Sequence, residues 1–367
     1  MVDSTAGHDN TTNLSKLYDL TDHTEQIWFC AFNRTGTLLG TTGTDKSIKL
    51  YQFNTTEQKY QLVNEILQQH TRTIRSLSFH PTSRLLASGS FDSEINIYKY
   101  NTDTSQYELQ HNLDGHENEI KCVAYNMSGE LLASCSRDKS IWIWSLTNDS
   151  INDEYECMSV LNGHTADVKY VAWLDNNALI SASYDNTIRI WRDDVDTDDF
   201  ICSQILGTAD TNSNDKVDDT DQLVNQKNDI IGHTSTVWCV AVNPNNSNQF
   251  ISCSDDCTLI LWSRTDATSQ FNQSIKLSNL HTRTIYSCDW NTDNYIVTVG
   301  ADNQIILYKY TEINNKSTVT VQCRLPNAHK NDINCVKFKP DSNMICTVSD
   351  DIVVSLWKYE TITSSNM

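Results

Sequence analysis

A pattern of four side chains returns seven times along this chain, and it constrains the fold more than any other feature. Each copy starts with a histidine, and the histidines are 46–48 residues apart except for one interval of 69. An aspartate follows 21–23 residues after each histidine, with Ser or Thr four positions before it and Trp or Tyr six positions after it. Such periodicity indicates a repeat architecture, in which each copy is one structural unit that packs on the next.

The four positions agree in every copy, which excludes coincidence as their origin. The histidines are His23, His70, His116, His164, His233, His281 and His329. The hydroxyl residues are Thr41, Ser88, Ser134, Ser181, Ser252, Thr298 and Thr347. The aspartates are Asp45, Asp92, Asp138, Asp185, Asp256, Asp302 and Asp351. The aromatic residues are Tyr51, Tyr98, Trp144, Trp191, Trp262, Tyr308 and Trp357.

Between these positions the chain consists of short β-branched and aromatic runs, such as IKCVAY, LLASCS and SIWIWS, separated by turn residues. Runs of this kind are typical of β-strands. A small sheet cannot bury both of its faces alone, whereas a ring of stacked sheets buries both faces and leaves only short edges. The sequence therefore predicts an all-β ring of seven blades.

The repeat, which extends from about Leu14 to Glu360, resembles the WD repeat. The resemblance implies a seven-bladed WD40 β-propeller in which the histidine, hydroxyl, aspartate and aromatic residue of each copy form a hydrogen-bonded tetrad. The aspartate that often follows the aromatic residue in this family is absent, because Gln, Lys, Ser or Arg stands there in all seven copies.

The ends of the repeat predict how the ring closes. The chain ends within ten residues of Trp357, too soon for an outer strand, whereas the β-like segment Leu14–Leu20 precedes the first histidine. We therefore expect this N-terminal strand to complete the last blade. The propeller is expected over 14–360, between a disordered segment at 1–13 and a tail at 361–367. The interval of 69 residues contains an acidic stretch at 208–228, which predicts a disordered loop between blades four and five.

Composition argues against several classes of function. The net charge of −20 disfavours nucleic-acid binding, which needs basic residues to replace phosphate counterions. No apolar run is long enough for a transmembrane helix, and the N-terminus lacks the pattern of a secretory signal, so we expect a soluble intracellular protein with no membrane contact. The twelve cysteines include no CxxC pair, which predicts buried, reduced thiols and neither a metal site nor a cofactor.

The recurring Ser, His and Asp could suggest a hydrolase. However, the set occurs seven times, always with an aromatic residue, and the chain has no Gly-x-Ser-x-Gly motif. A catalytic triad needs one accessible nucleophile and an oxyanion hole. We therefore interpret the set as structural and expect no enzymatic activity.

Two positions in each copy predict a surface for partner proteins, because in a propeller they usually lie on the narrow face around the channel. One follows the first apolar residue of the innermost strand, and the other directly precedes the tetrad aspartate. Arg and aromatic residues dominate the energetics of protein interfaces. The candidates for partner binding are Trp28, Arg75, Phe91, Lys121, Arg137, Lys169, Tyr184, Trp238 and Tyr286.

Three runs carry a closer resemblance: LDGHENEIKCVAYNMSGELLASCSRDKSIWIW, EYECMSVLNGHTADVKYVAW and SASYDNTIRIW. They are similar to the WD-repeat proteins of cytosolic iron–sulfur protein assembly. This resemblance implies a non-catalytic scaffold in the cytoplasm and nucleus, a monomer that joins a hetero-complex. Its implied partners are a small acidic assembly factor, a HEAT-repeat adaptor, an iron-only-hydrogenase-like protein and the client apoproteins that receive a [4Fe–4S] cluster.

Within the SRDKS motif, Arg137 matches the exposed arginine of that family. Two alternatives remain open, because a fold does not determine a function. A substrate receptor of a ubiquitin ligase, or a histone-binding adaptor on chromatin, would use the same architecture.

Overall fold

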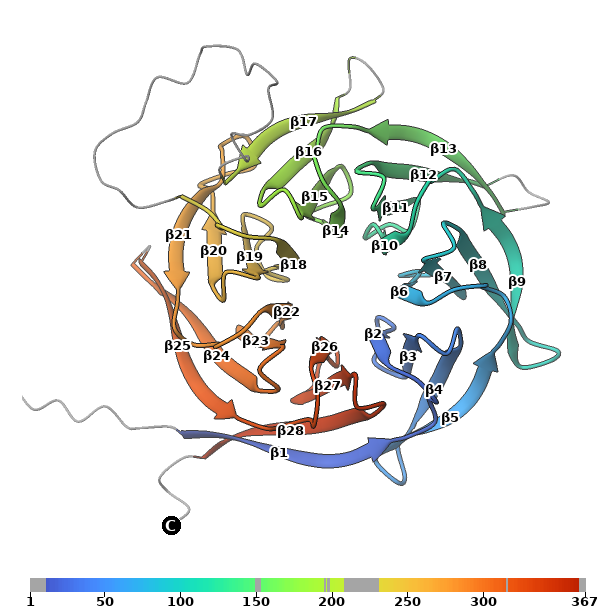
Figure 1. The fold of residues 1–367 in the computed structure, drawn as a ribbon, viewed down its shortest axis with the longest axis horizontal. Helices are drawn as coiled ribbons and strands as arrows, with labels where there is room; N and C mark the ends of the chain where they lie inside the picture. The colour runs from blue at the N-terminus through green and yellow to red at the C-terminus, as the bar shows by residue number, and fades with distance from the viewer. Residues whose placement is uncertain are drawn as a thin grey trace, which may run out of the picture.

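The computed structural model describes residues 11–148, 153–194, 196, 199–207, 231–314 and 316–362. These residues form seven antiparallel sheets of four strands each. The sheets stand as blades around a central axis (Figure 1). No helix in this part of the chain is long and apolar enough to cross a membrane. The chain is therefore a seven-bladed β-propeller, as the repeat predicted.

The strands occupy equivalent places in all seven blades. The innermost strands are β2 (Ile27–Phe32), β6 (Ile74–Phe79), β10 (Ile120–Tyr125), β14 (Val168–Trp173), β18 (Val237–Val242), β22 (Ile285–Trp290) and β26 (Ile333–Phe338). The second strands are β3 (Leu38–Gly43), β7 (Leu85–Ser90), β11 (Leu131–Ser136), β15 (Ala178–Ser183), β19 (Gln249–Ser254), β23 (Tyr295–Gly300) and β27 (Met344–Ser349). The third strands are β4 (Ile48–Asn54), β8 (Ile95–Asn101), β12 (Ile141–Asn148), β16 (Ile188–Asp194), β20 (Leu259–Ser263), β24 (Ile305–Ile313) and β28 (Val354–Ile362). The outer strands are β5 (Lys59–Ile66), β9 (Gln106–Leu113), β13 (Asp153–Leu161), β17 (Asp199–Leu206), β21 (Asn272–Leu277), β25 (Lys316–Leu325) and β1 (Thr11–Leu20).

Burial follows the position of a strand in its blade. Every residue of the second strands β7, β15, β19 and β27 is buried, because neighbouring blades cover both of their faces. Outer strands such as β5 and β17 are mostly exposed. The core lies between blades: one apolar cluster joins Leu39 and Leu50 of blade one to Leu77 of blade two and Leu356 of blade seven. Stacking of blades therefore supplies the burial that one sheet lacks.

The N-terminal strand closes the ring. β1 pairs antiparallel with β28, and Leu14 lies opposite Tyr359. The two strands run side by side at the outer edge of the propeller (Figure 1). The Ser355 hydroxyl donates a hydrogen bond of 2.6 Å to Asp19, which is 336 residues away in the sequence. This pairing confirms the closure predicted from the missing outer strand of blade seven.

Both closing strands are longer than expected. β1 begins at Thr11 rather than Leu14, and β28 continues to Ile362. Residues 11–13 and 361–362, which were expected in disordered ends, are therefore part of the sheet. The ladder between them uses backbone groups, so the polar residues Thr11 to Asn13 can extend it without apolar side chains. Residues 1–10, the acidic stretch at 208–228 and residues 363–367 lie outside the described part of the chain.

Candidate functional site

In blade three, the four repeated side chains form a chain of hydrogen bonds. The Trp144 indole N–H donates to the Ser134 hydroxyl over 3.0 Å. The two ring nitrogens of His116 lie 2.8 Å from Ser134 and 2.8 Å from Asp138. Donation in the order Trp, Ser, His, Asp satisfies each of these buried groups, and an unsatisfied one would cost about 1–3 kcal/mol.

Blades four, five and seven have the same geometry. In each of them the indole N–H donates to the Ser or Thr hydroxyl over 2.8 Å. The residues that form these tetrads are His164, Ser181, Asp185 and Trp191; His233, Ser252, Asp256 and Trp262; and His329, Thr347, Asp351 and Trp357.

The three blades whose tetrad ends in tyrosine differ from this pattern. The phenol lies 3.1 Å from the hydroxyl in the pair Tyr308–Thr298 and 3.4 Å in the pair Tyr98–Ser88. The buried Tyr51 hydroxyl makes no hydrogen bond of normal geometry with a described residue, although His23 still contacts Asp45 and Thr41 at 2.7 Å. The hydroxyl of tyrosine and the indole N–H of tryptophan lie at different distances from the backbone. The hydrogen bond between the aromatic residue and the Ser or Thr hydroxyl is therefore weaker in these blades.

The tetrad environment determines the ionisation of its aspartate. Burial alone would raise the pKa of Asp138, but hydrogen bonds from His116 and Ser140 outweigh it and lower the pKa to about 2. The Ser134 side chain is fully buried behind this network. A catalytic nucleophile must reach its substrate, whereas this hydroxyl is enclosed by the blade and bonded to His116 and Trp144.

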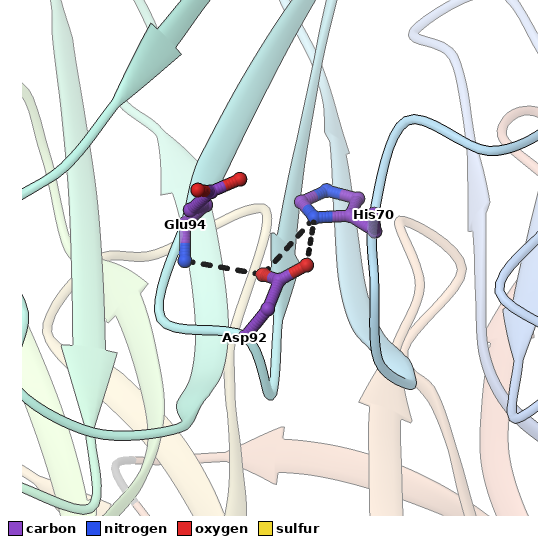
Figure 2. Close-up of side chains that lie close together, drawn as sticks. All are labelled: His70, Asp92 and Glu94. Carbon is purple, nitrogen blue, oxygen red and sulfur yellow. Dashed lines mark hydrogen bonds and ion pairs between the residues drawn. The ribbon is translucent and has the colours of Figure 1, made fainter.

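One group of side chains in blade two has the composition of a metal site: His70, Asp92 and Glu94. Figure 2 shows that the His70 ring and the Glu94 backbone N–H both face the Asp92 carboxylate, and His70 and Asp92 are tetrad residues of that blade. His70 Nδ1 lies 3.0 Å from Asp92, and its Nε2 lies 2.8 Å from the Ser88 hydroxyl. The Glu94 N–H also donates to Asp92, over 3.2 Å. Both ring nitrogens of His70 thus have hydrogen-bond partners within the blade. The three residues are arranged as a hydrogen-bonded turn.

The turn between the second and third strands fixes the residue that precedes each tetrad aspartate. The Arg137 N–H donates to the Glu119 carbonyl over 2.9 Å, and the Tyr184 N–H donates to the Asp167 carbonyl over 2.8 Å. Equivalent bonds occur in the other five blades. The side chains of Arg137 and Tyr184 therefore leave rigid turns, and they are 55% and 57% exposed.

The predicted partner-binding residues meet across neighbouring blades, and we call the nine of them the basic–aromatic rim. The Arg75 guanidinium lies 5.2 Å from the centre of the Trp28 ring, and the Lys121 ammonium lies 4.2 Å from that of Phe91. Both are cation–π geometries. The Trp28 indole also donates to Thr44 over 2.9 Å, so this ring is held in place by its own blade.

The rim continues into blades four, five and six. The Lys169 ammonium lies 5.2 Å from the ring centres of both Tyr184 and Trp238. Trp238 packs edge-on against Tyr286, with the ring centres 5.1 Å apart. The structure thus brings eight of the nine rim residues into pairwise contact.

Arg137, the ninth residue, is linked to the rest of the rim by the carboxylate of Glu119, which is not at a repeated position. Glu119 lies 3.7 Å from Arg137, 2.7 Å from Lys121 and 3.0 Å from Arg72. Three cations thus share one carboxylate, so this part of the rim keeps an excess of positive charge. Glu119 stands just before strand β10 and outside the repeated positions, which is why the repeat did not reveal it.

Blades five and seven carry an acidic side chain at the turn position that Arg137 occupies in blade three. Asp255 and Asp350 precede their tetrad aspartates, as Arg137 does. Asp332 lies 3.3 Å from Arg283 and 3.4 Å from the Tyr286 hydroxyl. Acidic side chains thus accompany the rim in blades five and seven.

A second charged group lies on the innermost strands. The Lys337 ammonium, on β26, lies 3.1 Å from the Tyr170 hydroxyl and 3.6 Å from the Asp289 carboxylate. In the other five blades the strand position of Asp289 and Lys337 is Ala or Ser. This departure from the repeat is the signal that sequence analysis missed.

A family model for the WD domain, G-beta repeat, matches the chain in seven segments. The matched residues are 14–52, 61–99, 107–145, 155–192, 225–263, 273–309 and 320–358.

Curated relatives named probable cytosolic iron-sulfur protein assembly protein 1 are also similar. The protein from Scheffersomyces stipitis is 32% identical over 67% of this chain and 67% of its own length. Those from Sclerotinia sclerotiorum and Vanderwaltozyma polyspora are 30% and 32% identical, over 68% and 67% of this chain and 62% and 65% of their own lengths. This chain thus spans about two thirds of the length of these relatives. It belongs to the WD-repeat family, and its relatives there include proteins named for cytosolic iron–sulfur protein assembly.

Proposed function

We propose that this protein is a non-catalytic scaffold of cytosolic iron–sulfur protein assembly, which docks assembly factors and client apoproteins through the basic–aromatic rim. The names of its relatives support a role in cytosolic iron–sulfur protein assembly. The contacts of the rim support the docking role. The proposal assigns no chemical step to the tetrads, whose hydroxyl groups are buried.

One observation carries the proposal: Arg137 and Tyr184 stand largely exposed on rigid turns, beside lysines that are themselves held over aromatic rings. A side chain that is already ordered loses little entropy when it binds. A guanidinium can also pair with a carboxylate through two parallel hydrogen bonds. The rim therefore suits a partner that presents carboxylates beside apolar groups.

The partners we propose are a small acidic assembly factor, a HEAT-repeat adaptor, an iron-only-hydrogenase-like protein and client apoproteins. The iron–sulfur cluster is the cargo of these partners and is not held by the propeller. We propose that the protein acts in the cytoplasm and nucleus as a monomer that joins a hetero-complex.

Affinity purification from native extract tests this function. The bait is the full chain, and the test variant is Arg137→Glu with Tyr184→Ala, which changes two exposed side chains of the rim. The control is Lys316→Glu, an exposed residue at the start of β25. We expect iron–sulfur assembly proteins with the wild type and the control, and their loss with the double variant. Recovery of cullin adaptors or nucleosomes in their place would overturn the proposal.

A further inference from the structure

A cleft of about 650 Å³ lies between blades one and two. It is lined by the turn from β2 to β3, by the turn from β6 to β7, and by parts of β4, β5, β8 and β9. In an antiparallel blade, the turn from the first to the second strand lies at the opposite end from the turn that carries the tetrad aspartate. The cleft therefore opens on the face opposite the basic–aromatic rim.

Part of the cleft lining is apolar, and its aromatic residues are partly exposed. Leu38, Leu50 and Phe79 contribute to it, together with Val63, which is 52% exposed. Most of the other lining residues are polar. Ligand sites likewise combine an apolar surface with polar groups that orient the ligand. A large apolar side chain of a partner could be buried there.

The charges of the cleft are unusual for this chain. None of the described residues that line it is acidic, although the whole sequence has 47 acidic and 27 basic residues. Arg34 and Arg84 are both exposed, one from each blade. Arg84 lies 5.4 Å from the centre of the Tyr100 ring, and no described carboxylate pairs with either arginine. Two cations are thus available in a cleft with an apolar wall.

Hydrogen bonds hold the walls of the cleft in place. The Tyr107 N–H donates to the Asn64 side chain over 3.1 Å, which ties the outer strands of the two blades together. In the turn of blade two, the N–H of Ser83 donates to His80 over 2.9 Å. In blade one, the Leu38 N–H donates to the Asn33 side chain over 3.0 Å. A site that is ordered before binding loses less entropy when it is filled.

We propose that this cleft binds an acidic peptide segment of a partner protein. Its carboxylates pair with Arg34 and Arg84, and one large apolar side chain lies against Leu38, Val63 and Phe79. Because the cleft and the rim lie on opposite faces, both can be occupied at once. The inference goes beyond the proposed function and does not depend on it.

Selection from a random-peptide library on the full-length chain tests the proposal. The selected peptides should be enriched in Asp or Glu beside a large apolar residue. A labelled synthetic copy then provides the dissociation constant by fluorescence anisotropy. We expect Arg34→Glu with Arg84→Glu to weaken binding at least about tenfold, because charge-assisted pairs are lost. Arg34→Lys with Arg84→Lys should weaken it less, since charge remains.

Two controls separate this site from the rim. Arg137→Glu with Lys316→Glu reverses two charges elsewhere and should leave peptide affinity unchanged. Thermal melting should be the same for all variants, because every substituted side chain is exposed. The proposal is overturned if the peptides lack acidic residues, if the Arg34/Arg84 variant binds them normally, or if Arg137→Glu abolishes binding. It is also overturned if the chain binds a polyuridine oligonucleotide more tightly than the peptides.

Discussion

The Arg137 guanidinium lies 3.7 Å from the Glu119 carboxylate, and both residues belong to blade three. Burial alone would raise the pKa of Glu119, but Lys121 and Arg72 outweigh it and lower the pKa. The carboxylate is therefore charged at neutral pH and is shared among three cations. Arg137 is more than half exposed, so its ion pair with Glu119 adds little stability and leaves the guanidinium free to exchange partners.

Substitutions of Arg137 should weaken partner binding in a fixed order. Arg137→Glu should have the largest effect, then Arg137→Ala, then Arg137→Lys, because lysine keeps the charge but loses the paired hydrogen bonds. Partner recovery and the activity of cytosolic iron–sulfur enzymes in cells provide the measurement, and folding should not change. Normal recovery and normal enzyme activity with a stably folded Arg137→Glu protein would contradict the assignment of this residue to the site.

Asp138→Ala should destabilise blade three. It leaves His116 and Ser140 without the carboxylate that both of them contact, and we expect a loss of about 1–3 kcal/mol. Thermal unfolding measures the effect. Asp103→Ala is the matched control, because Asp103 is exposed in the turn from β8 to β9. Equal melting temperatures for the two variants would refute a stabilising role for the tetrad.

The tetrads also predict how stability depends on pH. Burial alone would raise the pKa values of Asp45, Asp92 and Asp138, but their histidine partners outweigh it and lower all three to about 2. An unfolded aspartate has a pKa of about 3.9, so the stabilisation is fully present above this value and is lost as the pH falls towards 2.

Urea unfolding as a function of pH measures this loss. The stability gap between the wild type and Asp138→Ala should be constant near neutral pH and should narrow below about pH 4. A gap that stays constant down to pH 2 would show that Asp138 does not carry this linkage.

Two N-terminal truncations should behave differently. Removal of residues 1–20 deletes β1 and leaves β28 with an unpaired edge, which should lower the melting temperature and promote association. Removal of residues 1–10 keeps the whole of β1 and should change neither property. Identical behaviour of the two proteins would mean that the pairing of β1 with β28 does not hold the ring together.

Deletion of residues 208–228 should preserve the fold. The described ends of this interval meet, because a Cβ atom added at Gly232 would lie only 2.6 Å from the Gly207 Cα. Both glycines have positive φ values, 96° and 94°, which other residues rarely adopt. Two residues, 229 and 230, would then link Gly207 to Ile231. A soluble variant with an unchanged melting temperature is the expected result, and insoluble protein would show that the stretch is structural.

The sequence predicted those features that repeat. His116 and Asp138 could be paired because the same residue types recur 21–23 residues apart in all seven copies, which predicts one geometry for every blade. The closing strand was predictable from the outer strand that the last copy lacks. Its start at Thr11 was not, because a backbone ladder between polar residues leaves no hydrophobic pattern.

Contacts that occur in only one copy of the repeat could not be predicted from the sequence. Glu119 gathers three cations only because blades two and three bring Arg72, Lys121 and Arg137 together in space. The Tyr51 hydroxyl shows the reverse case: the repeat predicts a partner for it, and the geometry of its blade does not supply one. The effect of a difference between copies can therefore be interpreted only when the packing of the neighbouring blades is known.

The pairing of β1 with β28 has a consequence for biosynthesis. β1 leaves the ribosome long before β28, the strand with which it pairs. During translation of the six complete blades between them, the backbone groups of β1 have no partner in their own blade. An unpaired strand edge is a template for aggregation. The nascent chain therefore carries this unpaired strand until β28 has left the ribosome, and only then can β1 join its own sheet.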